Sequence, residues 1–129
     1  MKQFKIKRFS NEAKKDNVSD ELLSHTLCDF LKIELMGQKK FSLGAGLYKL
    51  RLATKEGKGK RGGARSILAF KNDNRIVWLH LFSKNEKENV STTDLKKLKL
   101  LSHILLDLPD NEFKKLIELG ELYEVNEHV

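Results

Sequence analysis

The sequence has little of what stabilises extracellular proteins or anchors a protein in a membrane. Cys28 is the one cysteine among 129 residues, so no disulfide can form within the chain, as is typical of a reducing cytoplasm. No run approaches the roughly 18 apolar residues of a transmembrane helix. The basic segment 1–9 never becomes the apolar run of a signal peptide. No Cys/His pair has the spacing of a zinc site. We therefore expect a cytoplasmic protein with no membrane span, metal or cofactor.

Acidic residues are almost absent from residues 49–65, and this gives the chain its main asymmetry. The stretch reads KLRLATKEGKGKRGGAR and holds a single acid, Glu56, among seven basic residues. It carries a net charge of +6 out of the chain's +7, so the rest sums to about neutral. Its glycines let the backbone approach a ligand and expose N–H groups. Such a stretch is suited to phosphate, so we expect it to bind a polyanion, most often nucleic acid. It lacks the Gly-Lys-Ser/Thr ending of a nucleotide P-loop.

Composition and periodicity predict one globular α+β domain over residues 1–129. Hydrophobic residues make up 40% of the chain and charged residues 33%. Apolar spacing and end signals predict strands at 4–9, 47–53, 65–70 and 76–82, and helices at 19–35, 91–106 and 109–120. Residues 11–15 are interpreted as a helical turn, and residues 121–125 as a short strand or an ordered tail. Ser19 is expected to cap the first helix and Thr93 or Ser91 the second, and Pro109 is expected at the first position of the third. Residues 38–42 are interpreted as a linker. The three middle strands have short connections, which indicates a small antiparallel sheet with N-terminal and C-terminal helices.

Alternation within the strand 47–53 divides its residues between two faces. Tyr48, Leu50 and Leu52 are expected to face the helices, because apolar side chains two residues apart share a face. Lys49 and Arg51 then lie on the opposite face. The sequence therefore predicts two cations on a sheet surface beside the glycine-rich loop.

Several motifs resemble one known family. They are residues 46–49 (GLYK), 51–53 (RLA), 57–65 (GKGKRGGAR), 69–70 (AF), 82–90 (FSKNEKENV) and 120–125 (GELYEV). In this order and spacing they resemble the RelE/HigB-like toxins of bacterial type II toxin–antitoxin systems, in a subgroup with a Gly/Lys-rich hairpin loop. The resemblance spans roughly residues 1–125 and implies a RelE/ParE-like, microbial-RNase-like fold.

The resemblance also implies an activity and partners. Members of this family are mRNA interferases, hydrolases that cut mRNA in the ribosomal A site and so inhibit translation. They are held inactive by an antitoxin, often a helix-turn-helix protein, and meet operator DNA only through it. The antitoxin is expected to dock on the basic face or to displace the last helix.

The residues can be assigned to the needs of metal-independent RNA cleavage. The 2′-OH must lose a proton, the phosphorane charge must be stabilised and the 5′-oxygen must gain a proton. Charge stabilisation falls to Lys49, Arg51 and Arg65 on strands, with Arg65 assigned to the transition state and Lys84 completing the cluster. The loop cations are assigned to RNA binding: Lys55, Lys58, Lys60 and Arg61.

The general acid and base are the open question. Many members of the family carry a tyrosine after the position matching Lys84, and the nearest position here is Ser91. Glu86 is a candidate base, or alternatively an ion-pair partner of Lys84. His80 is a second candidate, or alternatively a histidine that lines the core or a groove.

The sequence is compatible with two other functions. The same fold acts in the ParE branch by binding DNA gyrase, although a protein target does not need so dense a basic loop. Alternatively, the chain is a nucleic-acid-binding module without catalytic activity. The absence of the family tyrosine would then explain the absence of catalysis.

Overall fold

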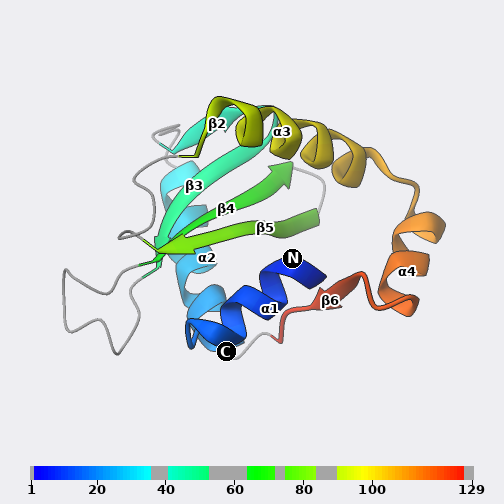
Figure 1. Cartoon of the computed structure of the whole chain (residues 1–129), viewed down its shortest axis with the longest axis horizontal. Coiled ribbons are helices and arrows are strands. Elements are labelled where there is room, and N and C mark those ends of the chain that lie inside the picture. Colours follow the sequence, from blue (N-terminus) through cyan, green and yellow to red (C-terminus); the bar gives the residue numbers. More distant parts are fainter. Residues whose placement is uncertain (1, 36–40, 53–63, 72–74, 84–89, 127–129) are drawn as a thin grey trace.

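The structure is a computed structural model that describes residues 2–35, 41–52, 64–71, 75–83 and 90–126. In these residues, helices lie on both faces of one six-stranded sheet with the order β2-β3-β4-β5-β1-β6 (Figure 1). None of the described helices has the length and apolar content needed to cross a membrane. The elements are β1 (Lys2–Ile6), α1 (Lys7–Lys15), α2 (Asp20–Leu35), β2 (Ser42–Gly44), β3 (Leu47–Leu52), β4 (Ala64–Lys71), β5 (Arg75–Ser83), α3 (Thr92–Asp107), α4 (Asp110–Glu118) and β6 (Leu122–Glu124).

The α+β class is confirmed, and so is the antiparallel meander of β3, β4 and β5. The sheet as a whole is mixed rather than antiparallel, because β1 pairs with β5 in parallel. The chain leaves β1 through α1 and α2 and forms three other strands before it returns as β5, so the two strands need not run in opposite directions. The C-terminal β6 then pairs antiparallel with β1.

Two apolar cores lie on opposite faces of the sheet. The first lies under α1 and α2 and includes Phe9, Leu23, Phe30, Leu50, Leu52, Leu68 and Trp78. The second lies on the face that α3 and α4 cover and includes Phe4, Leu47, Ile67, Val77, Leu79, Phe82, Leu105 and Phe113. Strands β4 and β5 contribute side chains to both cores, which explains why their sequences are almost continuously apolar.

The N-terminal strand prediction was wrong beyond Ile6, whereas the helical turn predicted at residues 11–15 is confirmed as part of α1. The predicted strand 4–9 ends at Ile6, and Phe9 belongs to α1, where it is buried with its ring centroid 5.8 Å from that of Trp78. Phe9 and Ala13 are four residues apart and share the buried side of α1, which is a helical spacing. The predicted linker 38–42 also ends in an unpredicted strand, because Ser42 begins β2 beside β3.

Serine side chains begin two helices: Ser19 caps α2 as predicted, and Ser91, one of the two caps predicted for α3, is the one observed. Ser19 Oγ accepts a hydrogen bond of 3.1 Å from the Leu22 N–H at the start of α2. Ser91 Oγ accepts one of 3.1 Å from the Asp94 N–H at the start of α3. Each bond satisfies an N–H that lacks a partner inside the helix. Pro109 is the N-cap residue of α4 rather than its first helical residue.

A carboxylate at the end of α3 gives the fold one pH-sensitive contact. Asp107 Oδ1 accepts a hydrogen bond of 2.9 Å from Lys71 Nζ on β4, and His103 Nδ1 lies 3.3 Å from Asp107 Oδ2. The hydrogen bond and the charge of Lys71 lower the pKa of Asp107 below 3.8. A lowered folded-state pKa stabilises the fold above the unfolded pKa, and this contribution is lost as pH falls through the folded pKa.

Lys71→Met is therefore expected to raise the pKa of Asp107 toward its ordinary value. The stability difference between the variant and the wild type should be present near neutral pH and should close in acid. A carboxyl-detected NMR titration at low ionic strength measures the pKa directly, because salt screens an exposed pair. Lys97→Met on α3 is the control, and an Asp107 pKa that Lys71→Met leaves unchanged would contradict the assignment.

Candidate functional site

Three cations project from neighbouring positions on β3 and β4, and we call Lys49, Arg51 and Arg65 the cationic face. Arg51 is the register partner of Arg65, and Lys49 is the partner of Ile67. Directly opposite residues on antiparallel strands have Cβ atoms about 4.5–5.5 Å apart and share a side of the sheet. The intervening Leu50 and Leu52 belong to the core under α1 and α2. The predicted division of β3 into an apolar face and a charged face is thus confirmed.

Helix α3 covers one end of this side of the sheet. Ser102 Oγ donates a hydrogen bond of 2.9 Å to the Ala45 carbonyl, and Leu106 packs close to Gly46, just before β3. Figure 1 shows α3 running across the N-terminal end of β3 and the C-terminal end of β4. Lys49 and Arg51 follow one another along β3 away from α3, and Arg51 is exposed.

Arg65 carries an enclosed hydrogen-bond donor that has no acceptor among the described residues. It is half-buried, and its Nη1 is fully enclosed yet has no hydrogen-bond partner among the described residues. A buried donor without an acceptor costs about 1–3 kcal/mol, more when it is charged. The like charge of Arg51 directly opposite costs a further 0.2–1 kcal/mol or so. A bound phosphate would relieve both costs, since it supplies acceptors and negative charge to the same two side chains.

A β-bulge in β5 brings His80 onto the side of the cationic face. Leu68 pairs with Trp78 but Ile67 pairs with His80, so the register shifts by one residue at Leu79. Trp78 packs in the core under α1 and α2, whereas His80 shares the side of its partner Ile67. Bulges commonly redirect a side chain in this way beside functional sites. His80 therefore lies in one row with Ile67 and Lys49 across three strands.

The adjacent row combines both arginines with an aromatic ring. Arg65 pairs with Arg51 on one side and with Phe82 on the other. The Phe82 ring is buried, and its centroid lies 5.3 Å from that of the His80 ring. The two rows together place three cations and one histidine on a compact patch of three strands.

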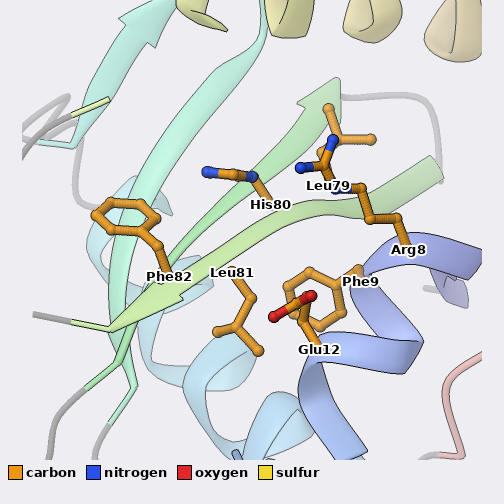
Figure 2. Close-up of a pocket in the computed structure, with 7 residues that line it drawn as sticks. All are labelled: Arg8, Phe9, Glu12, Leu79, His80, Leu81 and Phe82. Atoms are coloured by element: carbon orange, nitrogen blue, oxygen red, sulfur yellow. The ribbon is translucent and has the colours of Figure 1, made fainter. Parts of the chain in front are cut away.

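A cleft with a volume of about 220 Å³ adjoins this patch (Figure 2). Helix α1 contributes Arg8 and Glu12 to it, and β5 contributes His80 and Phe82. The register of β1 with β5 ends at Trp78, so α1 rather than a strand lies beside the following part of β5. The cleft is lined by Arg8, Phe9, Glu12, Leu79, His80, Leu81 and Phe82.

The remaining site residues predicted from the sequence lie outside the described residues. These are Lys84 and Glu86, and the loop cations Lys55, Lys58, Lys60 and Arg61. Ser91, the position predicted to be nearest that of the family tyrosine, accepts the capping hydrogen bond of α3. The Ser91 side chain therefore caps a helix.

Arg8 and Glu12 were missed by the sequence analysis. They are four residues apart on α1 and so share a side of the helix, but Arg8 fell within a segment predicted as a strand. A helical reading of residues 7–15 would have found them. Among the described residues, no three His, Cys, Asp or Glu side chains come together as a metal-binding group.

The chain matches a model of a known protein family. Residues 1–125 match the RelE toxin of the RelE/RelB toxin–antitoxin system. The match runs from β1 through β6 and includes every residue of the cationic face and of the cleft.

Proposed function

The chain belongs to the RelE toxin family and is thus the toxin of a toxin–antitoxin pair, and we propose that it is a ribosome-dependent endoribonuclease. In this proposal it cuts mRNA in the ribosomal A site, without a metal, and so inhibits translation. The observation that carries the proposal is the enclosed Arg65 Nη1, which has no acceptor among the described residues, beside Arg51 and Lys49.

The cationic face suits the charge that develops during RNA cleavage. Attack of the 2′-oxygen on phosphorus concentrates negative charge on the phosphoryl oxygens. Donors that already point at this position stabilise the transition state without reorganisation. Arg65 and Arg51 sit on paired strands, which hold them more rigidly than a loop would. We assign transition-state stabilisation to Arg65, with Arg51 and Lys49 binding the same phosphate.

Proton transfer and flanking contacts complete the proposed mechanism. Lys84 is assigned to charge stabilisation and Glu86 to the base; Lys84 directly follows β5 in sequence and Glu86 comes two residues later. His80 is the alternative proton-transfer group, supported by its place in the row with Lys49. Lys55, Lys58, Lys60 and Arg61 would bind flanking phosphates of mRNA or ribosomal RNA.

The family implies a cognate antitoxin, and we propose its type and its mode of binding. We expect a helix-turn-helix protein that contacts operator DNA and presents acidic side chains to the cationic face. Binding there would inhibit cleavage, since antitoxin and mRNA phosphate would compete for the same cations.

Mapping mRNA 5′ ends on programmed ribosomes tests the activity. Purified toxin should create new 5′ ends within the A-site codon when ribosomes are present and should leave free mRNA intact. The Arg51→Ala/Arg65→Ala double variant, purified in parallel, controls for contaminating nuclease. Intact mRNA on ribosomes together with growth arrest in cells would reject cleavage. DNA damage on expression would then favour a gyrase inhibitor, and salt-sensitive RNA binding would favour a binding module.

A further inference from the structure

Gln3 is a polar side chain that lies completely buried beside an apolar core. It is on β1 and only 1% exposed. Its amide has a partner at each end: Oε1 accepts a hydrogen bond of 2.9 Å from the Trp78 Nε1–H, and Nε2 donates one of 3.0 Å to Ser24 Oγ on α2. Burying an amide costs free energy unless its polar groups are paired. An apolar residue would fill the same space without this requirement, so we expect the amide to have a role beyond packing.

The acceptor that Gln3 offers to Trp78 is held in place by α2. An indole can only donate a hydrogen bond, so the amide must turn its oxygen toward Trp78, and its bond to Ser24 fixes that orientation. The strand β1 is tied to α2 a second time, because Lys5 Nζ lies 2.7 Å from Asp20 Oδ1. Gln3 is therefore a fixed acceptor, and the indole meets it at one position of β5.

Trp78 is the last residue of β5 before the β-bulge. The register of β1 with β5 ends at Trp78, and the register of β4 with β5 shifts immediately after it, at Leu79. Because of this bulge, His80 and Phe82 lie on one side of β5 and Leu81 on the other (Figure 2). Strict alternation from Trp78 would instead put His80 and Phe82 in the core under α1 and α2. The place of the bulge thus decides which side of the sheet carries His80.

The apolar pattern of β5 does not fix the place of the bulge. Apart from His80, residues 76–82 are all apolar, and they contribute to both cores. A slip by one residue would exchange one apolar side chain for another on each face, so burial alone specifies this register weakly. The Trp78 N–H, by contrast, meets its acceptor only in the observed register. A buried donor without an acceptor is costly, so this hydrogen bond disfavours the slipped pairings.

We propose that Gln3 is a positioning residue for His80. Through the hydrogen bond to Trp78 it sets where the bulge of β5 falls, and the bulge holds His80 on the side of the cationic face. Gln3 itself touches no substrate, because it is buried on the other side of the sheet. The consequence for cleavage rests on the proposed function, with His80 as the group that transfers a proton. A displacement of about 1 Å of such a group can cost about 10²-fold in rate.

NMR of the folded protein tests the positioning without any cleavage. Gln3→Met has a similar shape but removes both hydrogen bonds of the amide. Trp78 is the only tryptophan, so its indole N–H gives one signal, and its exchange with solvent should become faster in Gln3→Met. The His80 ring signals should shift or split. The nuclear Overhauser effects between the His80 ring and Ile67, its register partner in the wild type, should weaken.

The double variant Gln3→Met/Trp78→Phe separates positioning from stability. Gln3→Met alone leaves the indole N–H without an acceptor and should unfold at a lower urea concentration than the wild type. Removal of both partners leaves no such group, so the double variant should recover stability but not the wild-type signals of His80. Both variants should cut mRNA on ribosomes with kcat lowered about 10–100-fold and KM unchanged, since the cations that bind the phosphate lie on β3 and β4.

Ser102→Ala is the matched control, because it removes another buried side-chain hydrogen bond, the one of 2.9 Å to the Ala45 carbonyl. It should lower stability and leave both the His80 signals and kcat unchanged. If Gln3→Met does not fold, Trp78→Phe removes the donor of the same bond and should shift the His80 signals in the same way.

Three results would overturn the inference. The first is a folded Gln3→Met with the His80 signals of the wild type. The second is a double variant whose kcat returns together with its stability, which would make the hydrogen bond purely structural. The third is an equal change of the His80 signals in Ser102→Ala. Failure of the proposed function is distinguishable from these, because a wild-type protein that leaves mRNA intact on ribosomes rejects the nuclease while the NMR results still decide the positioning.

Discussion

Arg65→Ala is expected to lower ribosome-dependent mRNA cleavage about 10²–10³-fold, the loss typical of removing one preorganised transition-state donor. The stability should not fall in parallel. Arg65 Nη1 has no partner among the described residues, so truncation breaks no hydrogen bond of that nitrogen. Truncation also removes a like charge opposite Arg51, which favours folding by a few tenths of a kcal/mol or so. Lost activity with retained stability is the signature of a functional arginine.

Arg65→Lys and a distant variant complete this experiment. Lysine keeps the charge but not the bidentate fork, so Arg65→Lys should recover only part of the activity. Lys32→Ala removes an exposed cation from α2, on the other side of the sheet, and should leave cleavage unchanged. Cleavage and urea unfolding are measured on the same preparations. An Arg65→Ala protein that cuts as fast as the wild type would remove Arg65 from the mechanism, and a loss of several kcal/mol would make it structural.

The charged face of β3 could be predicted from the sequence because the strand obeys a strict period of two. Lys49 and Arg51 alternate with Leu50 and Leu52, and burial of the leucines decides where the cations point. The pairing of Arg51 with Arg65 could not be predicted. It depends on the register across the connection 53–63, which local residue patterns do not set.

The position of His80 could not be predicted for a different reason. Strict alternation would put His80 on the same side as Trp78, in the core under α1 and α2. The bulge at Leu79 reverses this, and nothing in the apolar run 76–82 marks where the extra residue falls. A bulge depends on how two strands pair, whereas the β-propensity of residues describes a single strand.

The cleft was hidden by the unmarked start of α1. Its N-cap residue is Ile6, which makes no side-chain capping bond, and its first turn contains no acid. The usual start signals of a helix are therefore missing. Tertiary burial of Phe9 and Ala13 stabilises α1 instead. This burial depends on packing against Trp78 of β5, which the residues of α1 alone do not reveal. Lys84 and Glu86 lie outside the described residues, so their roles remain predictions.

Arg75→Ala is expected to destabilise the fold by about 3–4 kcal/mol, the lower end of the sum of two charge-assisted hydrogen bonds and a cation–π contact. Arg75 Nη1 donates to the carbonyls of Leu105 and Leu108 at 2.8 and 2.7 Å, and its guanidinium carbon lies 4.1 Å from the centre of the Phe113 ring. The last turn of α3 has no basic residue of its own. Arg75 therefore supplies the positive charge that complements the carbonyl end of the helix.

The ion pair with Asp110 should matter far less than those contacts. Arg75 Nη2 lies 2.7 Å from Asp110 Oδ1, but the Asp110 side chain is fully exposed, and exposed pairs contribute at most about 1 kcal/mol. Asp110→Ala is thus expected to cost about 0.5 kcal/mol, and Arg75→Lys should recover only part of the loss. Lys2→Ala is the control, because Lys2 is the exposed β1 partner of Arg75. Urea unfolding that gave equal small losses for Arg75→Ala and Asp110→Ala would contradict this ranking.

Arg75→Ala is expected to change the stability of the fold without changing the rate at which the folded protein cuts mRNA. Arg75 lies at the start of β5, at the end of the sheet that α3 covers, whereas Arg65 pairs with Phe82 near the opposite end of the same strand. The variant should therefore cut mRNA at the wild-type rate at a temperature where it is folded, and should lose activity only as it unfolds. Arg65→Ala should show the reverse, with full folding and little cleavage at every temperature. Measuring cleavage and unfolding of both variants across one temperature series distinguishes the two kinds of arginine.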